Sequence, residues 1–161
     1  MTDDNAAIAR AIIDANAYMV LATADASGLP WASPVWFAAE EYRELVWVSS
    51  PEARHSRNLA ARPQLSIVIF DSTVAPGSGT GVYMSATAEA LTGDEVDAGL
   101  SVYARGSEAA GLRVWTRDDV QPPARHRIYR AVASEHFILG ERDERVPLSL
   151  PSSPAGGGGR S

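Results

Sequence analysis

Three serines, two arginines and a histidine lie close together between residues 49 and 59, directly after an apolar run that we predict to be a strand. Ser50 before Pro51 is typical of a helix start, because a serine hydroxyl can cap a free backbone N–H and proline has the backbone angle of the first helical position. Unpaired N–H groups at that helix start, the helix dipole, the serine hydroxyls and Arg54 predict a site for a dianionic phosphate. A phosphorylated cofactor is the expected ligand.

The charge pattern favours this interpretation over a merely solvated helix face, which the helix alone leaves open. The chain has a formal net charge of −6, yet residues 52–62 contain three arginines and the single acid Glu52. Arg54 and Arg57 lie near one another on a helix, and Arg62 lies at its end. This arrangement suits one local anion better than a long polyanion.

Composition excludes several kinds of chemistry. All 14 basic residues are arginine, so a lysine Schiff base and a lysine-containing phosphate loop are excluded. The chain has no cysteine, which excludes disulfides, thiolate nucleophiles and cysteine-bound metal sites. The negative net charge argues against nucleic-acid binding. Residues 1–14 do not resemble a secretory signal and no apolar run is long enough to cross a membrane, so we expect a cytoplasmic protein with no membrane contact.

The hydrophobic pattern predicts one domain over residues 1–150 and a disordered tail rich in Gly, Ser and Pro over residues 151–161. Six or seven short strands with a few helices predict a small antiparallel barrel with helical insertions. Strands are expected at residues 18–24, 31–38, 45–48, 65–70, 82–91, 127–139 and 145–150. Helices are expected at residues 4–16 and 51–61 and from residue 92 onwards, with partly helical structure at 108–120 and a loop at 71–81.

Four segments, in this order, resemble the flavin-binding split-barrel family related to pyridoxamine-phosphate oxidase. They are residues 21–30 (Leu-Ala-Thr-Ala-Asp to Gly-Leu-Pro), 33–37 (Ser-Pro-Val-Trp-Phe), 53–59 with the proline at 63, and 81–91 (Gly-Val-Tyr-Met to Ala-Glu-Ala-Leu). The resemblance covers roughly residues 10–140. It implies a mainly β fold, a six-stranded antiparallel split barrel with flanking helices, that forms a homodimer with FMN at the subunit interface.

The resemblance also implies which residues contact the cofactor. Ser33, Pro34, Val35 and Trp36 would lie along the isoalloxazine ring, and Ser49, Ser50, Arg54, His55 and Asn58 would surround the phosphate. Gly81, Val82 and Trp115 would approach the flavin across the interface. Plain core packing remains the alternative for Trp36, and a solvated position remains the alternative for His55.

Two departures from pyridoxamine-phosphate oxidases proper argue against vitamin B6 oxidation. Ala38 stands near the position of their lysine, and Arg125-His126 lacks the intervening residue of their Arg-x-His pattern. Residues 53–59 also fit relatives that use the deazaflavin coenzyme F-420. We therefore expect an FMN-dependent oxidoreductase that acts on a small planar substrate, with no catalytic residue assigned, and a deazaflavin-dependent reductase is the alternative.

A second alternative is a flavin or haem carrier or sensor without turnover. Its only candidate haem ligands are His55, His126 and His136. Each lies beside an arginine or a glutamate, so we expect all three to be surface histidines. Three scattered histidines show no metal-ligand spacing, so no metal site is expected.

Overall fold

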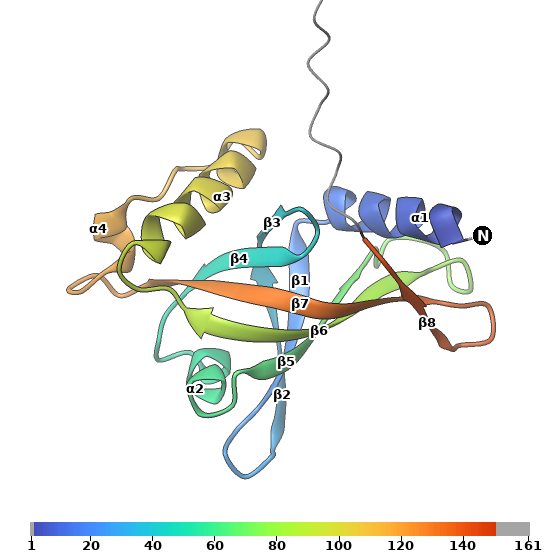
Figure 1. Cartoon of the computed structure of the whole chain (residues 1–161), viewed down its shortest axis with the longest axis horizontal. Helices are drawn as coiled ribbons and strands as arrows, with labels where there is room; N and C mark the ends of the chain where they lie inside the picture. Colours follow the sequence, from blue (N-terminus) through green and yellow to red (C-terminus); the bar gives the residue numbers. More distant parts are fainter. Residues whose placement is uncertain (1, 151–161) are drawn as a thin grey trace, which may run out of the picture.

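The computed structural model describes residues 2–150, and the tail expected to be disordered lies outside this range. The described chain forms eight strands and four helices (Figure 1). The strands are β1 (Tyr18–Ala24), β2 (Pro30–Trp36), β3 (Ala38–Glu40), β4 (Glu44–Ser49), β5 (Gln64–Phe70), β6 (Gly81–Ala90), β7 (Arg127–Leu139) and β8 (Arg145–Leu148). The helices are α1 (Thr2–Ala15), α2 (Arg54–Ala61), α3 (Glu95–Ala109) and α4 (Arg117–Val120).

All the strands belong to one antiparallel sheet in the order β2-β1-β5-β6-β7-β4-β3, with β8 paired to β7. The outer strands β2 and β3 are separated along the chain only by Phe37. The sheet must therefore curl so that the chain can pass from one edge to the other within one residue. Phe37 is buried, and its N–H donates to the carbonyl of Ala17. The result is a split barrel, which confirms the expected mainly β fold.

Alternate residues of β4 face two different hydrophobic cores, as the two-residue period of a strand requires. Leu45 and Trp47 belong to the core inside the barrel, whereas Val46 and Val48 pack outside it, beneath α3. Trp47 is fully buried and stacks on Tyr129 of β7, with 5.5 Å between the ring centroids. Large side chains therefore fill the barrel interior.

The two long helices cover different parts of the barrel (Figure 1). α1 packs against β5, β6 and β8 and buries Ala9 and Ile13 in the inner core. α3, which lies in the helical region expected from residue 92 onwards, packs against β3, β4 and β7 with Val96, Leu100 and Tyr103. No helix within residues 2–150 is both long and apolar enough to span a membrane.

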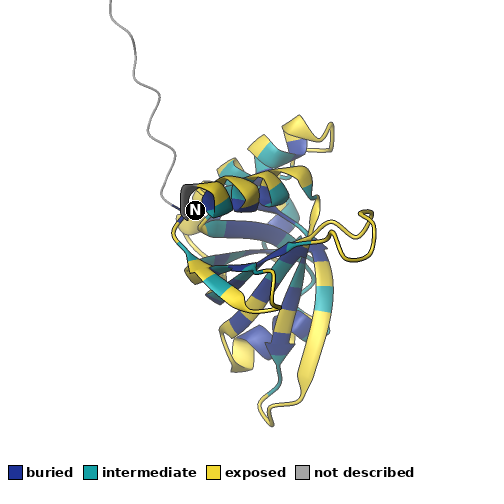
Figure 2. Cartoon of the chain, turned by 90° about the vertical axis from the view of Figure 1, so that its right-hand side faces the viewer, coloured by how far each residue is buried: buried dark blue, intermediate teal, exposed yellow. Residues whose placement is uncertain are grey.

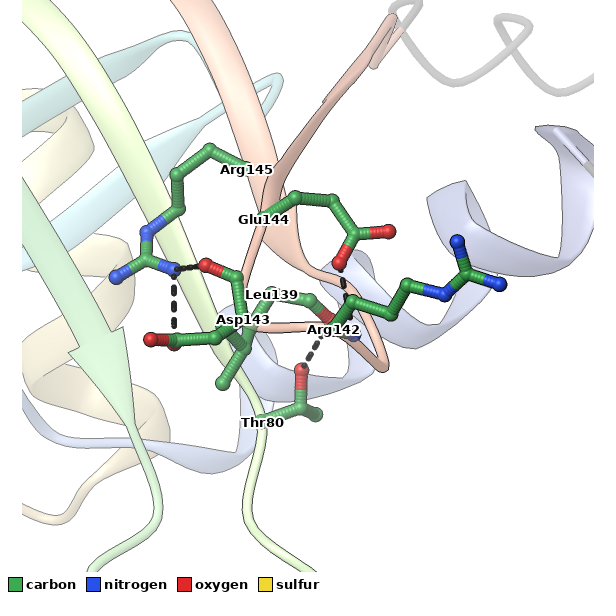
Figure 3. Close-up of polar contacts among 6 residues, drawn as sticks. All are labelled: Thr80, Leu139, Arg142, Asp143, Glu144 and Arg145. Carbon is green, nitrogen blue, oxygen red and sulfur yellow. Dashed lines mark hydrogen bonds and ion pairs between the residues drawn. The ribbon is translucent and has the colours of Figure 1, made fainter.

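A tight turn joins β7 to β8 (Figure 3). Asp143 has a left-handed backbone (φ 63°), and the N–H of Arg142 donates to the carboxylate of Glu144 at 2.8 Å. Arg145 pairs with Asp143, and its guanidinium lies over an aromatic ring of β6. The turn sends β8 back along β7, so that Leu150 returns to the inner core.

The structure corrects three details of the predicted elements. The pattern predicted six or seven strands and the family resemblance implied six, whereas eight are present, although β3 and β8 contain only three and four residues. The strand predicted over residues 31–38 is divided at Phe37, where the chain crosses between the sheet edges. The helix predicted from Pro51 begins at Arg54, because residues 50–53 form a separate turn.

Candidate functional site

The predicted phosphate site lies where β4 ends and α2 begins. The N–H of Ala53 donates to the carbonyl of Ser50 at 3.1 Å, and the N–H of Glu52 donates to the Ser50 hydroxyl, also at 3.1 Å. Ser50 therefore stabilises the turn before the helix and does not cap the helix itself, which corrects the prediction. The N-cap residue of α2 is Ala53, which has no side chain able to bond the first turn.

The first turn of α2 consequently keeps its backbone donors available. The N–H of Arg57 bonds the carbonyl of Ala53 at 3.0 Å, and it is the first N–H of the helix to find a partner. Within residues 2–150, the N–H groups of residues 54–56 have no hydrogen-bond acceptor. Three free donors at the positive end of a helix dipole are a suitable site for an anion.

Arg54 lies beside these donors with its charge unpaired. Its guanidinium carbon lies 4.3 Å from the centroid of the Trp31 ring of β2, which is a cation–π contact. No carboxylate or carbonyl among residues 2–150 accepts a hydrogen bond from it. The stacked face fixes the guanidinium plane, so its N–H edges remain free for a ligand.

The neighbouring arginines have structural partners instead. Arg57 donates to the carbonyl of Glu52 at 2.8 Å, and Arg62 donates to the carbonyl of Ala26 at 2.8 Å. Both side chains hold turns in place. Of the three arginines that give residues 52–62 their positive charge, only Arg54, the one predicted to contact the phosphate, is left uncommitted within the described chain.

α2 is unusual because the face that it buries is largely polar. His55, Ser56 and Asn58 are buried together with the single apolar residue Leu59. The Nε2 of His55 lies 3.0 Å from the hydroxyl of Ser49 at the end of β4. Burial lowers the pKa of His55, so the ring is neutral near pH 7 and contributes hydrogen bonding without charge. The hydroxyl of Ser56 is buried without a partner in the described chain, and such a group calls for a ligand or water.

Asn58 connects α2 to the β1–β2 hairpin. Its amide donates to the hydroxyl of Thr23 at 3.0 Å, and that hydroxyl donates to the carbonyl of Trp31 at 3.3 Å. Because Trp31 also stacks on Arg54, the helix start and β2 are held together from two sides. A phosphate at α2 and a ring along β2 would therefore keep a fixed separation.

β2 is the strand predicted to contact the flavin ring, and it is an outer strand of the sheet. Figure 2 shows the β1–β2 hairpin at the bottom of the molecule, with β2 exposed over most of its length. Pro34 is exposed and Ser33 half-buried, which fits the preference of proline for edge strands. Val35 is buried, and Trp36 packs edge-on against Tyr103 at 4.8 Å between the ring centroids.

The structure does not bring every predicted residue to this place. β5 leads away from α2 to Phe70, which pairs with Gly81, so Gly81 and Val82 lie at the far end of the sheet. Trp115 lies between α3 and α4 and contacts the ring of His126 edge-on at 5.2 Å. His126 precedes the start of β7, which pairs with the end of β4 beside Ser49.

The expectation of three surface histidines is wrong for two of them. His55 is 8% exposed and His136 is 9% exposed, because both lie on faces that turn toward the barrel. Only His126 is half-buried. The Nε2 of His136 donates to the carbonyl of Tyr42 at 2.8 Å. No cluster of potential metal ligands occurs in the described part of the chain.

Sequence reasoning missed Thr23, Trp31 and Ser56. The signal that could have found Ser56 is the inverted pattern of α2, in which polar residues occupy the positions where a surface helix normally buries apolar ones. Trp31 could not have been found from spacing, because its contact with Arg54 depends on the pairing of β2 with β1.

The curled antiparallel sheet with its flanking helices places the chain in the class of split-barrel β proteins, and the comparisons identify the family. Residues 7–137 match the family model described as pyridoxamine 5'-phosphate oxidase. The chain therefore belongs to the pyridoxamine 5'-phosphate oxidase-like split-barrel family. A search among curated proteins gives no significant match.

Several solved structures share the fold. A haem-binding protein from Mycobacterium smegmatis is 25% identical with a TM-score of 0.69, and the match covers 89% of this chain but 57% of that chain. The haem storage protein HutZ from Vibrio cholerae is 25% identical with a TM-score of 0.66, over 80% of this chain and 90% of that chain. An FAD-binding protein from Mesorhizobium loti is 19% identical with a TM-score of 0.58, over 83% of this chain and 90% of that chain.

Proposed function

We propose that the protein binds FMN with its phosphate at the first turn of α2, and that it is an oxidoreductase acting on a small planar substrate. The observation that carries this proposal is the state of Arg54, whose guanidinium is oriented by Trp31 but has no anionic partner in the described chain. Three free N–H groups lie at the same helix start, and Ser49 and Ser50 directly precede the turn that leads into it.

The donor set matches a phosphate monoester. A dianion accepts several hydrogen bonds at once, and here one fixed cation and a helix start supply them. The neutral His55 can add a hydrogen bond through Ser49. The buried, unpartnered hydroxyl of Ser56 is one turn or less away from these donors along α2. The residues therefore fit the phosphate of the cofactor that the family commonly uses.

The ring would lie along the exposed edge of β2. Ser33 and Pro34 offer backbone groups there, and the exposed Trp31 marks an apolar surface that a second subunit would cover. Gly81, Val82 and Trp115 would then come from the partner subunit of a homodimer. This explains why one chain alone leaves Gly81 and Val82 a strand length away from α2.

Bound FMN would supply hydride or electron transfer at its ring. The residues of this chain would bind the phosphate, orient the ring and exclude water from its inner face. No acid or base of this chain is assigned a proton-transfer role.

Spectroscopic titration tests the proposal. We expect the purified protein to perturb the visible spectrum of added FMN, and we expect Arg54→Gln to weaken this binding by about tenfold or more, because a charge-assisted contact is lost. Arg117→Gln is the matched control, since it removes the same charge from a residue already paired with Asp97. Failure to bind FMN would overturn the proposal, and preferential binding of coenzyme F-420 would replace it with the deazaflavin alternative.

A haem carrier is the second candidate, because two structural neighbours at 25% identity are described as haem proteins. His55 and His136 already engage Nε2 in hydrogen bonds, which leaves His126 as the half-buried candidate ligand. A Soret band on addition of haemin that disappears in His126→Ala, together with no FMN binding, would favour the carrier over the oxidoreductase.

A further inference from the structure

A hollow lies away from α2, between α1, β8 and the turn that joins β3 to β4. It has a volume of about 800 Å³, a size that suits a small organic ligand. None of the residues that line it belongs to α2 or β2. The lining combines two arginines, a buried histidine and a group of apolar side chains: Arg10, Arg43, His136, Val146, Leu148 and Leu150.

Neither arginine is neutralised by an ion pair within residues 2–150, although Arg10 interacts electrostatically with Tyr42, whose hydroxyl bonds Asp14. Arg10 lies on α1 and Arg43 lies just before β4. Neither guanidinium makes a hydrogen bond or an ion pair within residues 2–150. By contrast, Arg105, Arg113 and Arg117 all pair with carboxylates. In a chain with a net charge of −6, two unpaired cations in the wall of one hollow require an explanation.

The position of Arg43 is fixed by its neighbour Tyr42. The phenol of Tyr42 donates to the carboxylate of Asp14 on α1 at 3.0 Å. The carbonyl of Tyr42 accepts the Nε2–H of His136 at 2.8 Å. Helix α1, strand β7 and the turn before β4 are therefore joined around the hollow, and the two arginines are carried on elements that cannot easily separate.

The charge balance of the hollow is positive. Burial, together with the nearby Arg43, lowers the pKa of His136, so its ring is neutral near pH 7. The remaining charged groups in the wall are the two guanidiniums and the exposed carboxylate of Glu135. An anion in the hollow would therefore face a net positive wall.

The apolar side chains in the wall indicate that the anionic ligand also has a hydrocarbon part. Val146 and Leu148 of β8 are half-buried, and Leu150 is buried against the inner core. A purely inorganic anion would make no use of these side chains. A ligand with a charged head and a hydrocarbon body would contact both parts of the lining.

We propose that this hollow is a binding site for a small amphipathic organic anion, with its carboxylate or phosphate head between Arg10 and Arg43 and its apolar body against Val146, Leu148 and Leu150. This site is distinct from the proposed phosphate site at the start of α2. It gives the protein a second ligand whose binding does not depend on the proposed flavin.

Calorimetric titration of the full chain with octanoate tests the proposal. We expect octanoate to bind, and we expect Arg10→Gln and Arg43→Gln each to weaken binding by about tenfold, as the loss of a charge-assisted contact predicts. Arg142→Gln is the matched control, because Arg142 is an exposed arginine that does not line the hollow. Far-ultraviolet circular dichroism of each variant shows whether it is folded.

Two further ligands measure the contributions of the apolar and the charged parts of the site separately. 1-Octanol has the same apolar body without the charge, and inorganic phosphate has the charge without the body, so both should bind much more weakly than octanoate. Equal affinity of octanoate for the wild type and for the folded Arg10→Gln/Arg43→Gln double variant would overturn the proposal. Inorganic phosphate binding as tightly as octanoate would also overturn it.

Discussion

The hydrogen bond between Asn58 and Thr23 offers a sharp test of how α2 is held on the barrel. Both residues are 4% exposed, and the amide of Asn58 donates to the Thr23 hydroxyl at 3.0 Å. Thr23→Val keeps the shape of the side chain but removes the acceptor. Asn58→Leu removes the donor and leaves the hydroxyl with only its 3.3 Å bond to the carbonyl of Trp31.

The expected loss of unfolding free energy in each variant follows from the burial of both groups. Leaving one buried polar group without its partner costs about 1–3 kcal/mol, more than the bond itself contributes when both partners are present. Each single variant should therefore lower the free energy of unfolding by about 2 kcal/mol. The double variant should lower it by clearly less than the sum, with a coupling energy of about 1 kcal/mol or more, because the second change removes a group that is already unpaired.

Urea unfolding followed by tryptophan fluorescence measures these values. Thr87→Val is the matched control, since Thr87 lies exposed on β6 and its loss should change the free energy of unfolding by less than about 0.5 kcal/mol. The reasoning would be refuted if Thr23→Val were as stable as Thr87→Val. It would also be refuted if the effects of Thr23→Val and Asn58→Leu were simply additive.

Two further predictions concern the buried histidines and the contact of α3 with β3. Burial lowers the pKa of His55 and His136 below the ordinary 6.5, so the unfolded chain binds protons that the folded chain does not. The free energy of unfolding should therefore fall as the pH is lowered from about 7.5 to about 5.5, a range above the titration of the carboxylates. Urea unfolding at several pH values should give a shallower slope for His136→Gln, and an unchanged slope would contradict the assignment. Gly106→Ala should lower the melting temperature although alanine is the better helix former, because the new Cβ would lie 2.8 Å from the Cβ of Ala38, which has no rotamer to escape. A higher melting temperature would show that α3 can move away from β3 at no cost.

Much of the fold could be predicted from local patterns. The boundaries of β1 were predicted to the residue, and those of β5 and β6 to within one residue. β1 and β5 are largely apolar runs and β6 alternates apolar with polar residues, and turn-forming segments flank these strands. The division of residues 31–38 into β2 and β3 could not be predicted. The division results from closure of the sheet, in which the buried Phe37 links the two edge strands. Such a tertiary contact is not visible in the local sequence pattern.

The start of α2 was singled out from the sequence as a phosphate site, which stays a prediction, and the local geometry there depends on tertiary contacts. Ser50-Pro51 resembles a helix start, yet the hydroxyl of Ser50 bonds Glu52 within a preceding turn. Residues beside arginine and glutamate looked exposed, yet His55 and His136 are buried because they face the barrel. Burial of a polar side chain requires a partner on another element, and such partners are known only once the strands are paired.

The contribution of the FMN phosphate to binding affinity tests the central claim most directly. FMN and riboflavin share the same ring, and only FMN carries the phosphate that Arg54 is proposed to bind. Fluorescence titration should show that the wild type prefers FMN by about tenfold or more, and that Arg54→Gln loses most of this preference while Arg117→Gln retains it. Equal affinity of the wild type for the two flavins, or an undiminished preference in Arg54→Gln, would contradict the assignment of the phosphate to the start of α2.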